Sequence, residues 1–301
     1  GFSGEVIRIS PDSPSHLNPM DINDNYADDD NPVSLKADFI LTICDLLSGG
    51  LQRGQNSIVD RVVRMAYEKY YATKGAMPPT LNNFYDILVT QPEQEAQSLA
   101  LSLELYIKGN LSVFAHHTNV DTQNRFVIYD IRDLGKQLRT LGMLVVLDQI
   151  WNRVTQNRSL GKHTYIYIDE IQLLFTNAYS SNYFFELWSR SRKWGAVPTG
   201  ITQNVETLLL SDEARRMLSN CDYIMMLNQA TSDRLELANL LSISERQLNY
   251  VTNVEAGSGL LFAGKSIIPF VDKFPRDTEL YRMITTKLEE VVKNQASEEK
   301  G

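Results

Sequence analysis

Two adjacent carboxylates follow an apolar run in the middle of the chain, and such a pair can serve metal-dependent hydrolysis. Asp169 and Glu170 come directly after residues 165–168, which read as a strand inside a sheet. Open parallel sheets bind ligands at the carboxyl ends of their strands. The first carboxylate would hold Mg²⁺, directly or through water, and the second would orient or deprotonate the water that attacks a terminal phosphate. Ordinary strand-to-helix junctions carry the same pattern when a carboxylate caps the helix.

Two further polar residues could belong to such a site. Gln203 follows the next apolar run, and its amide could bond the terminal phosphate or the attacking water, although polar residues after strands are commonly turn formers. Arg192 lies in a basic cluster at the end of a helical segment. It either complements the negative C-terminus of that helix or reaches, as an arginine finger, a nucleotide bound by an adjacent subunit. Both interpretations of Arg192 stay open.

The elements around these residues alternate between strand and helix. Helical spacing with short loops fills residues 34–110, which we expect to form an all-helical subdomain. Beyond it, strands are predicted at 126–130, 165–168, 197–202 and 222–227, helices at 136–157 and 182–194, and a hairpin over 259–270. This alternation predicts an α/β fold with a mainly parallel sheet covered by helices.

The pattern divides the chain into four parts. Residues 1–33 begin the sheet-containing core, and residues 34–110 form the inserted helical subdomain. Residues 111–275 complete the core with the acidic and sensor strands, and residues 276–301 form a C-terminal helix, expected over 277–293, with a polar tail.

Composition restricts the possible function classes. The formal net charge of −8 argues against a freestanding nucleic-acid binder, which needs clustered Lys and Arg. Cys44 and Cys221 are the only cysteines and have no metal-ligand spacing, so we expect neither a zinc site nor a disulfide framework. The sequence has no apolar stretch of about eighteen residues. We therefore expect a cytoplasmic protein.

A phosphate-binding loop is missing from the pattern. A nucleotide hydrolase of this type needs a glycine-rich loop ending in Gly-Lys-Ser or Gly-Lys-Thr between a strand and a helix. The nearest match, Gly264, Lys265 and Ser266, falls between two predicted strands and reads as a hairpin turn. Since this loop should precede the acidic strand, we expect it upstream of Gly1, and we expect residues 1–301 to bind little ATP or Mg²⁺ alone.

Motifs in a fixed order over nearly the whole chain resemble the VirB-four class of type IV secretion ATPases, in the form found in conjugative elements of Gram-positive bacteria. Each motif is weak alone, but their order is specific. They are Gly4-Glu5-Val6-Ile7, His16-Leu17-Asn18-Pro19-Met20-Asp21, Tyr129-Asp130-Ile131 with Leu134, Tyr167-Ile168-Asp169-Glu170, Arg192-Lys193-Trp194-Gly195, Thr202-Gln203-Asn204, Gly259-Leu260-Leu261, Phe274-Pro275, Leu280-Tyr281 and Thr285-Thr286.

The resemblance implies a RecA-like P-loop NTPase core with an inserted helical subdomain. Asp169 and Glu170 match the family's magnesium and water-activating pair, Gln203 its sensor, and Arg192 an arginine-containing motif. ATP and Mg²⁺ would be the cofactors of the intact protein. The implied assembly is a homo-hexamer at the cytoplasmic face of the membrane, bound to a type IV secretion channel and inner-membrane components, with possible transient DNA contact.

Two other functions remain open at this point. A DNA-pumping ATPase of the FtsK, HerA or coupling-protein class shares the acidic strand and the sensor glutamine, and steeply salt-dependent DNA binding would favour it. A non-catalytic scaffold could lack the phosphate loop altogether, but it would have no chemical need for Asp169, Glu170 and Gln203 together.

Overall fold

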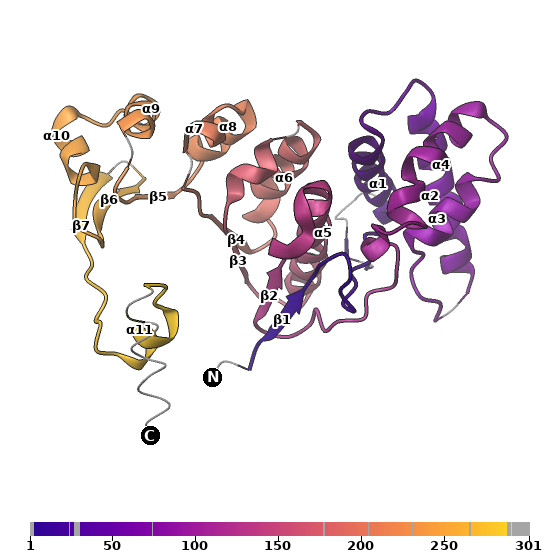
Figure 1. The fold of residues 1–301 in the computed structure, drawn as a ribbon, viewed down its shortest axis with the longest axis horizontal. Helices are drawn as coiled ribbons and strands as arrows, with labels where there is room; N and C mark the ends of the chain where they lie inside the picture. Colours follow the sequence, from indigo (N-terminus) through magenta and orange to yellow (C-terminus); the bar gives the residue numbers. More distant parts are fainter. Residues whose placement is uncertain are drawn as a thin grey trace. The chain divides into compact units, whose positions relative to one another are not determined.

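A computed structural model of the chain describes residues 3–23, 25–26, 31–73, 75–176, 178–203, 205–229, 231–264, 266–287 and 290. The chain forms two compact units. Unit 1 comprises residues 1–203 and 211–214, and unit 2 comprises residues 204–210 and 215–301. Figure 1 shows the helices and strands of both units.

Unit 1 holds two parallel strand pairs. β1 (Glu5–Arg8) pairs with β2 (Val127–Asp130), and β3 (Thr164–Ile168) pairs with β4 (Ala196–Gly200). Parallel pairing in this part of the chain confirms the predicted α/β class. The described strands form separate pairs and not one continuous sheet, because β2 and β3 make no ladder with each other.

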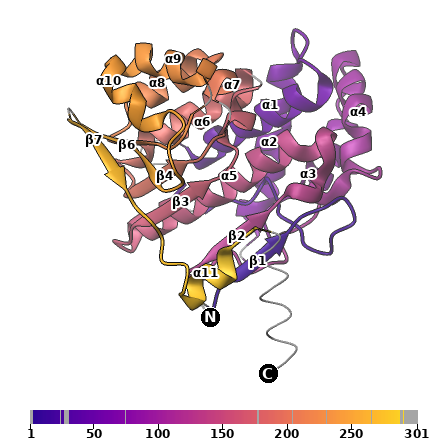
Figure 2. The same cartoon turned by 60° about the vertical axis from the view of Figure 1, so that its left-hand side comes forward.

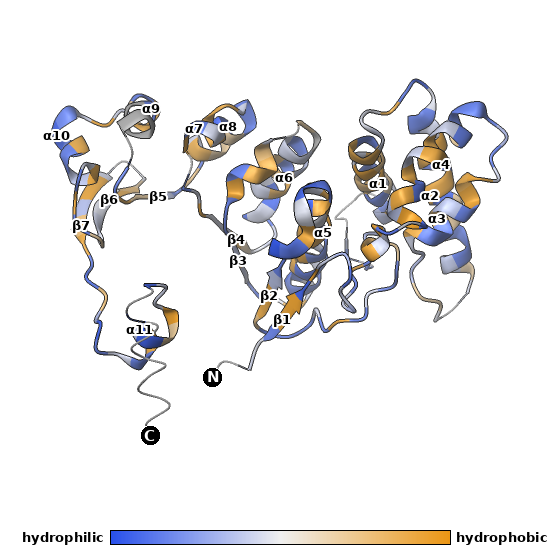
Figure 3. Cartoon of the chain, viewed as in Figure 1, coloured by the Kyte–Doolittle hydropathy of each residue, from blue (hydrophilic) through white to orange (hydrophobic). Residues whose placement is uncertain are grey.

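Four helices between β1 and β2 form the helical part of unit 1: α1 (Pro32–Ser48), α2 (Gln55–Ala72), α3 (Leu81–Leu88) and α4 (Gln94–Ile107). Figure 3 shows hydrophobic and hydrophilic residues on separate parts of these helices. Their apolar sides meet in one core with buried residues such as Phe39, Val62, Phe84 and Leu99. This burial removes apolar surface from water and is the main force holding the helices together.

Local sequence signals set the ends of these helices. Asn31 caps α1 by accepting a hydrogen bond from the backbone N–H of Val33, and Pro32 fits the first helical position because its fixed φ suits a helix. Gly49 ends α1 in the left-handed conformation that glycine adopts without strain. Thr80 and Asn83 form a reciprocal capping box at the start of α3.

Two helices cover one face of β3–β4. α5 (Gly135–Ser159) packs on β3, and α6 (Ala178–Ser191) packs on β4 and on α5 (Figure 2). Ile166 and Ala196 point into this layer and are buried. On the opposite face Tyr165 and Tyr167 are 66% and 71% exposed, so within the described residues helices cover this strand pair on one face.

An ion pair removed from water joins the helical part to α5. Nζ of Lys36 in α1 lies 2.6 Å from Oδ2 of Asp148, and both side chains are fully buried. The Tyr26 hydroxyl donates to Oδ1 of Asp148, and the Tyr183 hydroxyl of α6 lies 3.5 Å from the same oxygen. Burial lowers the pKa of the Lys36 ammonium and raises the pKa of the Asp148 carboxyl, while attraction between the charges opposes both shifts.

Unit 2 contains an antiparallel sheet in the order β5–β6–β7. β5 (Tyr223–Met226) pairs with β6 (Ser258–Ala263), and β6 pairs with β7 (Ser266–Val271). The predicted closing hairpin is thus confirmed; Lys265, which falls between β6 and β7 in the sequence, lies outside the described residues. Met226, Leu237, Val251 and Leu260 belong to the separate core of this unit.

The remaining elements are short. They are η1 (Ser112–Phe114), η2 (Arg132–Leu134), η3 (Ile171–Phe175), α7 (Val205–Leu209), α8 (Asp212–Ser219), α9 (Thr231–Leu241), α10 (Glu245–Leu248), η4 (Asn249–Val251) and α11 (Glu279–Ile284). α11 is shorter than the helix predicted over 277–293, because the backbone of Thr285 is extended. Residues 288, 289 and 291–301, which include the predicted tail, lie outside the described residues. Among the helices of the described residues, none has the length and apolar character needed to cross a membrane.

Replacing Lys36 by methionine tests the buried ion pair. Lys36→Met leaves a buried carboxylate without its opposite charge, so we expect it to lower the free energy of unfolding by about 3–5 kcal/mol. Arg64→Met breaks the partly exposed Arg64–Asp60 pair and should cost less than about 1 kcal/mol. The chain's tryptophans all lie in unit 1, so urea unfolding followed by tryptophan fluorescence reports this unit. Equal small losses in both variants would contradict this account.

The cost of Lys36→Met should also depend on pH. Burial holds the folded-state pKa of Asp148 above its unfolded value, so folding favours the protonated carboxyl. The penalty of an unpaired Asp148 should therefore be smallest below its unfolded pKa of about 3.9 and should grow as the pH rises through the folded-state pKa. A penalty that does not change with pH would show that the carboxyl is not held in a desolvated site.

Candidate active site

The acidic pair lies where β3 ends. Asp169 and Glu170 form the turn between β3 and η3, and Asp169 is exposed while Glu170 is half-buried. The Oδ1 atom of Asp169 accepts a hydrogen bond of 3.0 Å from the backbone N–H of Glu170. Both side chains therefore lie at the carboxyl end of a parallel strand pair, with carboxylate oxygens accessible to solvent.

The parallel register brings the end of β4 to the same edge. Ile168 is the partner of Gly200, and the backbone N–H of Ile201 donates to the carbonyl oxygen of Ile168 at 2.8 Å. The N–H of Ile171 then donates to the carbonyl oxygen of Ile201 at 3.0 Å. Gln203 follows two residues later and is exposed. The structure thus places Asp169, Glu170 and Gln203 at one edge.

The backbone of Glu170 has an uncommon conformation. Its φ of 52° and ψ of 43° lie in the left-handed region, which a residue with a Cβ adopts only at a cost. Strained residues of this kind concentrate at functional sites, where the surrounding structure holds them in place. The conformation reverses the chain between β3 and η3 and leaves the Glu170 side chain at the strand edge.

A glutamine that sequence reasoning missed contacts this carboxylate. Gln172 is 8% exposed, and its Nε2 donates to Oε2 of Glu170. Its Oε1 accepts a hydrogen bond of 2.6 Å from the Thr202 hydroxyl, which follows β4. The sequence signal was a single polar residue within the apolar run 171–175, which is buried at all other positions except Leu173.

Arg192 lies at the opposite end of the strand pair. It precedes β4, whereas Asp169 and Gln203 follow β3 and β4. A five-residue strand spans roughly 16 Å at about 3.3 Å per residue, so Arg192 does not share an edge with the acidic pair of its own chain. Its side chain is exposed, whereas the neighbouring Trp194 is buried against Trp151 and lies beneath the Arg158 guanidinium.

The two carboxylates at this edge suit Mg²⁺ better than a metal ion that needs several protein ligands. The described residues contain no group of three or more His, Cys, Asp or Glu side chains placed to hold a metal ion. Two adjacent carboxylates suit Mg²⁺, which prefers oxygen ligands and keeps several waters or phosphate oxygens. Asp169 and Glu170 are thus adequate as the protein's share of a magnesium nucleotide site.

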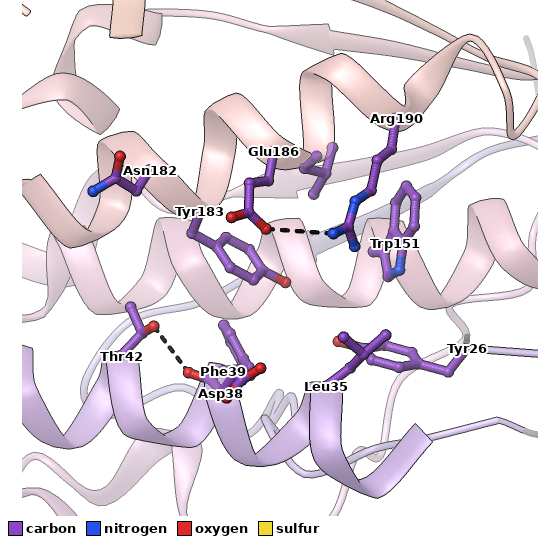
Figure 4. Close-up of a pocket in the computed structure, with 11 residues that line it drawn as sticks. Tyr26, Leu35, Asp38, Phe39, Thr42, Trp151, Asn182, Tyr183, Glu186 and Arg190 are labelled. Carbon is purple, nitrogen blue, oxygen red and sulfur yellow. Dashed lines mark hydrogen bonds and ion pairs between the residues drawn. The ribbon is translucent and has the colours of Figure 1, made fainter. Parts of the chain in front are cut away.

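A groove of about 280 Å³ lies elsewhere on unit 1, between α1, α5 and α6 (Figure 4). Phe39, Trp151 and Tyr183 line it with the partly exposed Glu186–Arg190 pair, and Asp169, Glu170 and Gln203 are not part of its lining. Partial burial, followed by the charges of Asp60 and Glu186, raises the pKa of Asp38 on its wall. Tyr26 and Tyr183, which line the groove, also contact the Asp148 carboxylate of the buried ion pair through their hydroxyls.

Comparison with known proteins identifies the fold. No protein-family model matches the chain, and no curated protein matches it. The structure of VirB4 of Thermoanaerobacter pseudethanolicus is similar, with a TM-score of 0.76 and 20% identity over 91% of this chain and 82% of that chain.

The bacterial conjugative coupling protein TrwB, as TrwBdeltaN70, is also similar. Its trigonal form in complex with sulphate gives a TM-score of 0.54 at 12% identity, over 91% of this chain and 75% of that chain. Its unbound monoclinic form gives 0.50 at 16% identity, over 91% and 81%. The chain therefore has the α/β fold of VirB4 and TrwB, and the resemblance inferred from sequence motifs is confirmed at the level of the fold.

Gly200→Ala tests how closely η3 packs on the end of β4. A Cβ at Gly200 would lie 2.3 Å from Cδ1 of Ile171, which is buried and cannot swing into solvent. We expect this variant to lower the stability of unit 1 by about 1–3 kcal/mol. Ile171→Val removes the clashing Cδ1 and should restore part of that loss in the double variant, by the same fluorescence-monitored unfolding. Additive losses in the double variant would contradict the close approach.

Proposed function

We propose that this chain provides the hydrolytic edge of a motor ATPase that energises type IV secretion or conjugative transfer. The observation that carries the proposal is the convergence of Asp169, Glu170 and Gln203 at the carboxyl edge of one parallel strand pair. The fold shared with VirB4 supports the same assignment.

Each residue at the edge has a role in this proposal. Asp169 holds Mg²⁺ directly or through a water, and Glu170 orients or deprotonates the water that attacks the terminal phosphate. Gln203 donates an amide hydrogen bond to that phosphate or to the water. When bound, Mg²⁺ and ATP supply the neutralising charge and the scissile bond, and the side chains contribute position and proton transfer.

Phosphate binding needs a loop that residues 1–301 do not supply. The only Gly-Lys-Ser sequence, at Gly264, Lys265 and Ser266, falls where β6 has ended at Ala263 and the antiparallel strand β7 begins at Ser266. A phosphate loop needs a strand before it and a helix after it, so that backbone N–H groups point at the phosphates. We therefore expect residues 1–301 alone to show weak ATPase activity or none.

The proposed assembly is a homo-hexamer at the cytoplasmic face of the membrane, in contact with a type IV secretion channel. The position of Arg192 at the amino end of β4 suits a contact made between subunits. An arginine that cannot reach the edge of its own chain can still reach a nucleotide bound by a neighbour. Arg192 is therefore proposed to act in trans.

Glu170→Gln tests the hydrolytic role in the longer protein that this proposal requires, with a phosphate loop upstream of Gly1. The variant cannot take a proton from water, so we expect Mg²⁺-dependent turnover to fall by about 10²–10⁴-fold with nucleotide affinity retained. Glu104→Gln, which changes an exposed carboxylate on α4, is the matched control and should keep the wild-type rate. Wild-type turnover by Glu170→Gln would refute the role of Glu170, whereas robust turnover by residues 1–301 alone would refute the expectation that they need a phosphate loop from elsewhere.

Mixing two inactive variants tests the role of Arg192. If Arg192 acts in trans, hexamers that mix Arg192→Ala subunits with Glu170→Gln subunits contain some interfaces with both residues intact. We expect the mixture to recover part of the turnover that each variant alone lacks. Recovery should require co-assembly, so it should disappear when the two are assembled separately. No recovery in mixed hexamers would place the defect of Arg192→Ala within its own subunit.

A second candidate function is a DNA-pumping motor of the coupling-protein class. The fold shared with the conjugative coupling protein TrwB favours it. The higher TM-score with VirB4 and the net charge of −8 favour the secretion motor, because strong binding to a phosphate backbone needs a positive surface.

A further inference from the structure

The buried side chain of Gln172 joins the end of β3 to the end of β4 through hydrogen bonds. Its Nε2 donates to Oε2 of Glu170, and its Oε1 accepts from the Thr202 hydroxyl at 2.6 Å. Thr202 directly precedes Gln203. One amide therefore links the proposed water-activating carboxylate to the segment that carries the proposed sensor.

The chemistry of its two partners fixes the orientation of this amide. An ionised carboxylate can only accept hydrogen bonds, so the NH₂ group of Gln172 must face Glu170. Its carbonyl oxygen then faces the Thr202 hydroxyl, which donates. The reversed amide would set an acceptor against the carboxylate and leave buried polar atoms unpaired, which costs about 1–3 kcal/mol per group.

The backbone holds the three residues in this arrangement. The left-handed Glu170 turns the chain so that Ile171 donates to the carbonyl oxygen of Ile201 at 3.0 Å. Ile171 is buried against Gly200, which leaves no room for a side chain at that position. Gln172 is thus carried on a short turn tied directly to the end of β4.

We infer that Gln172 is a positioning residue that fixes the Glu170 carboxylate and couples it to the sensor segment through Thr202. The inference deepens the proposed hydrolytic function and rests on it. By taking Oε2 of Glu170, Gln172 leaves Oε1 to accept a hydrogen bond from the attacking water. Movement of the sensor segment would displace Thr202 and turn the same carboxylate, so the water is activated only when the sensor is in place.

The contact itself is tested by NMR on the ¹⁵N-labelled 301-residue chain, without nucleotide. The side-chain amide signal of Gln172 is assigned by its loss in Gln172→Met. We expect this amide to exchange with water more slowly than that of the exposed Gln94, and to shift in Glu170→Ala and Thr202→Val. Thr202→Ser, which keeps the hydroxyl, should restore the wild-type signal. The inference would be overturned if the Gln172 amide exchanged with water as fast as that of Gln94 and its signal did not shift in Glu170→Ala or Thr202→Val.

The effect on hydrolysis is tested in the longer protein that the proposed function requires, with a phosphate loop upstream of Gly1. We expect Gln172→Met to lower kcat by about 10–100-fold, the usual loss when a residue that orients an active group is removed, with little change in KM for ATP. Gln94→Met is the control for a glutamine on an exposed helix surface. If Gln172→Met keeps the wild-type kcat while Glu170→Gln is inactive, the role of Gln172 is refuted and the proposed function still stands. An active Glu170→Gln would instead refute the proposed function, while the NMR result would still decide the contact.

Discussion

The buried ion pair between Lys36 and Asp148 is the constraint on which the architecture of unit 1 depends. Charges removed from water are tolerated only when they meet with good geometry, and these two lie 2.6 Å apart with no exposure. Lys36 belongs to α1 and Asp148 to α5, so their pairing fixes how the helical part lies on the helix that covers β3. The Tyr183 hydroxyl brings α6 to the same carboxylate.

The candidate active site depends on these helices indirectly, through the strands that they support. α5 and α6 support β3 and β4 from one face, and the parallel register then brings the two strand ends together. Within that frame, Glu170 can hold a left-handed conformation that costs about 1–3 kcal/mol, because Ile171 and Gln172 anchor the turn that follows it. Hydrogen bonds of the Ile171 backbone and the Gln172 side chain thus offset the strain at Glu170.

Sequence periodicity predicted most helices and strands of the described residues, because amphipathic spacing records which side of an element is buried. The placement of Asp169, Glu170 and Gln203 directly after apolar strands predicted their common edge for the same reason. The contacts of Gln172 could not be predicted, because they are set by a turn conformation that has no sequence signature. The Lys36–Asp148 pair also escaped prediction, since it joins residues 112 positions apart. The sequence predicted one continuous C-terminal helix because its periodicity continues past Thr285, where the backbone becomes extended and α11 ends.

The most direct test of the central claim is to locate a bound divalent ion. Crystals of the protein extended upstream to include the proposed phosphate loop, grown with Mn²⁺ and a non-hydrolysable ATP analogue, would show the metal by its anomalous scattering. The account predicts a metal peak beside the Asp169 carboxylate, bound directly or through one water, with Glu170 and Gln203 facing the terminal phosphate. A metal and nucleotide bound away from the ends of β3 and β4, for example in the groove between α1 and α6, would contradict it.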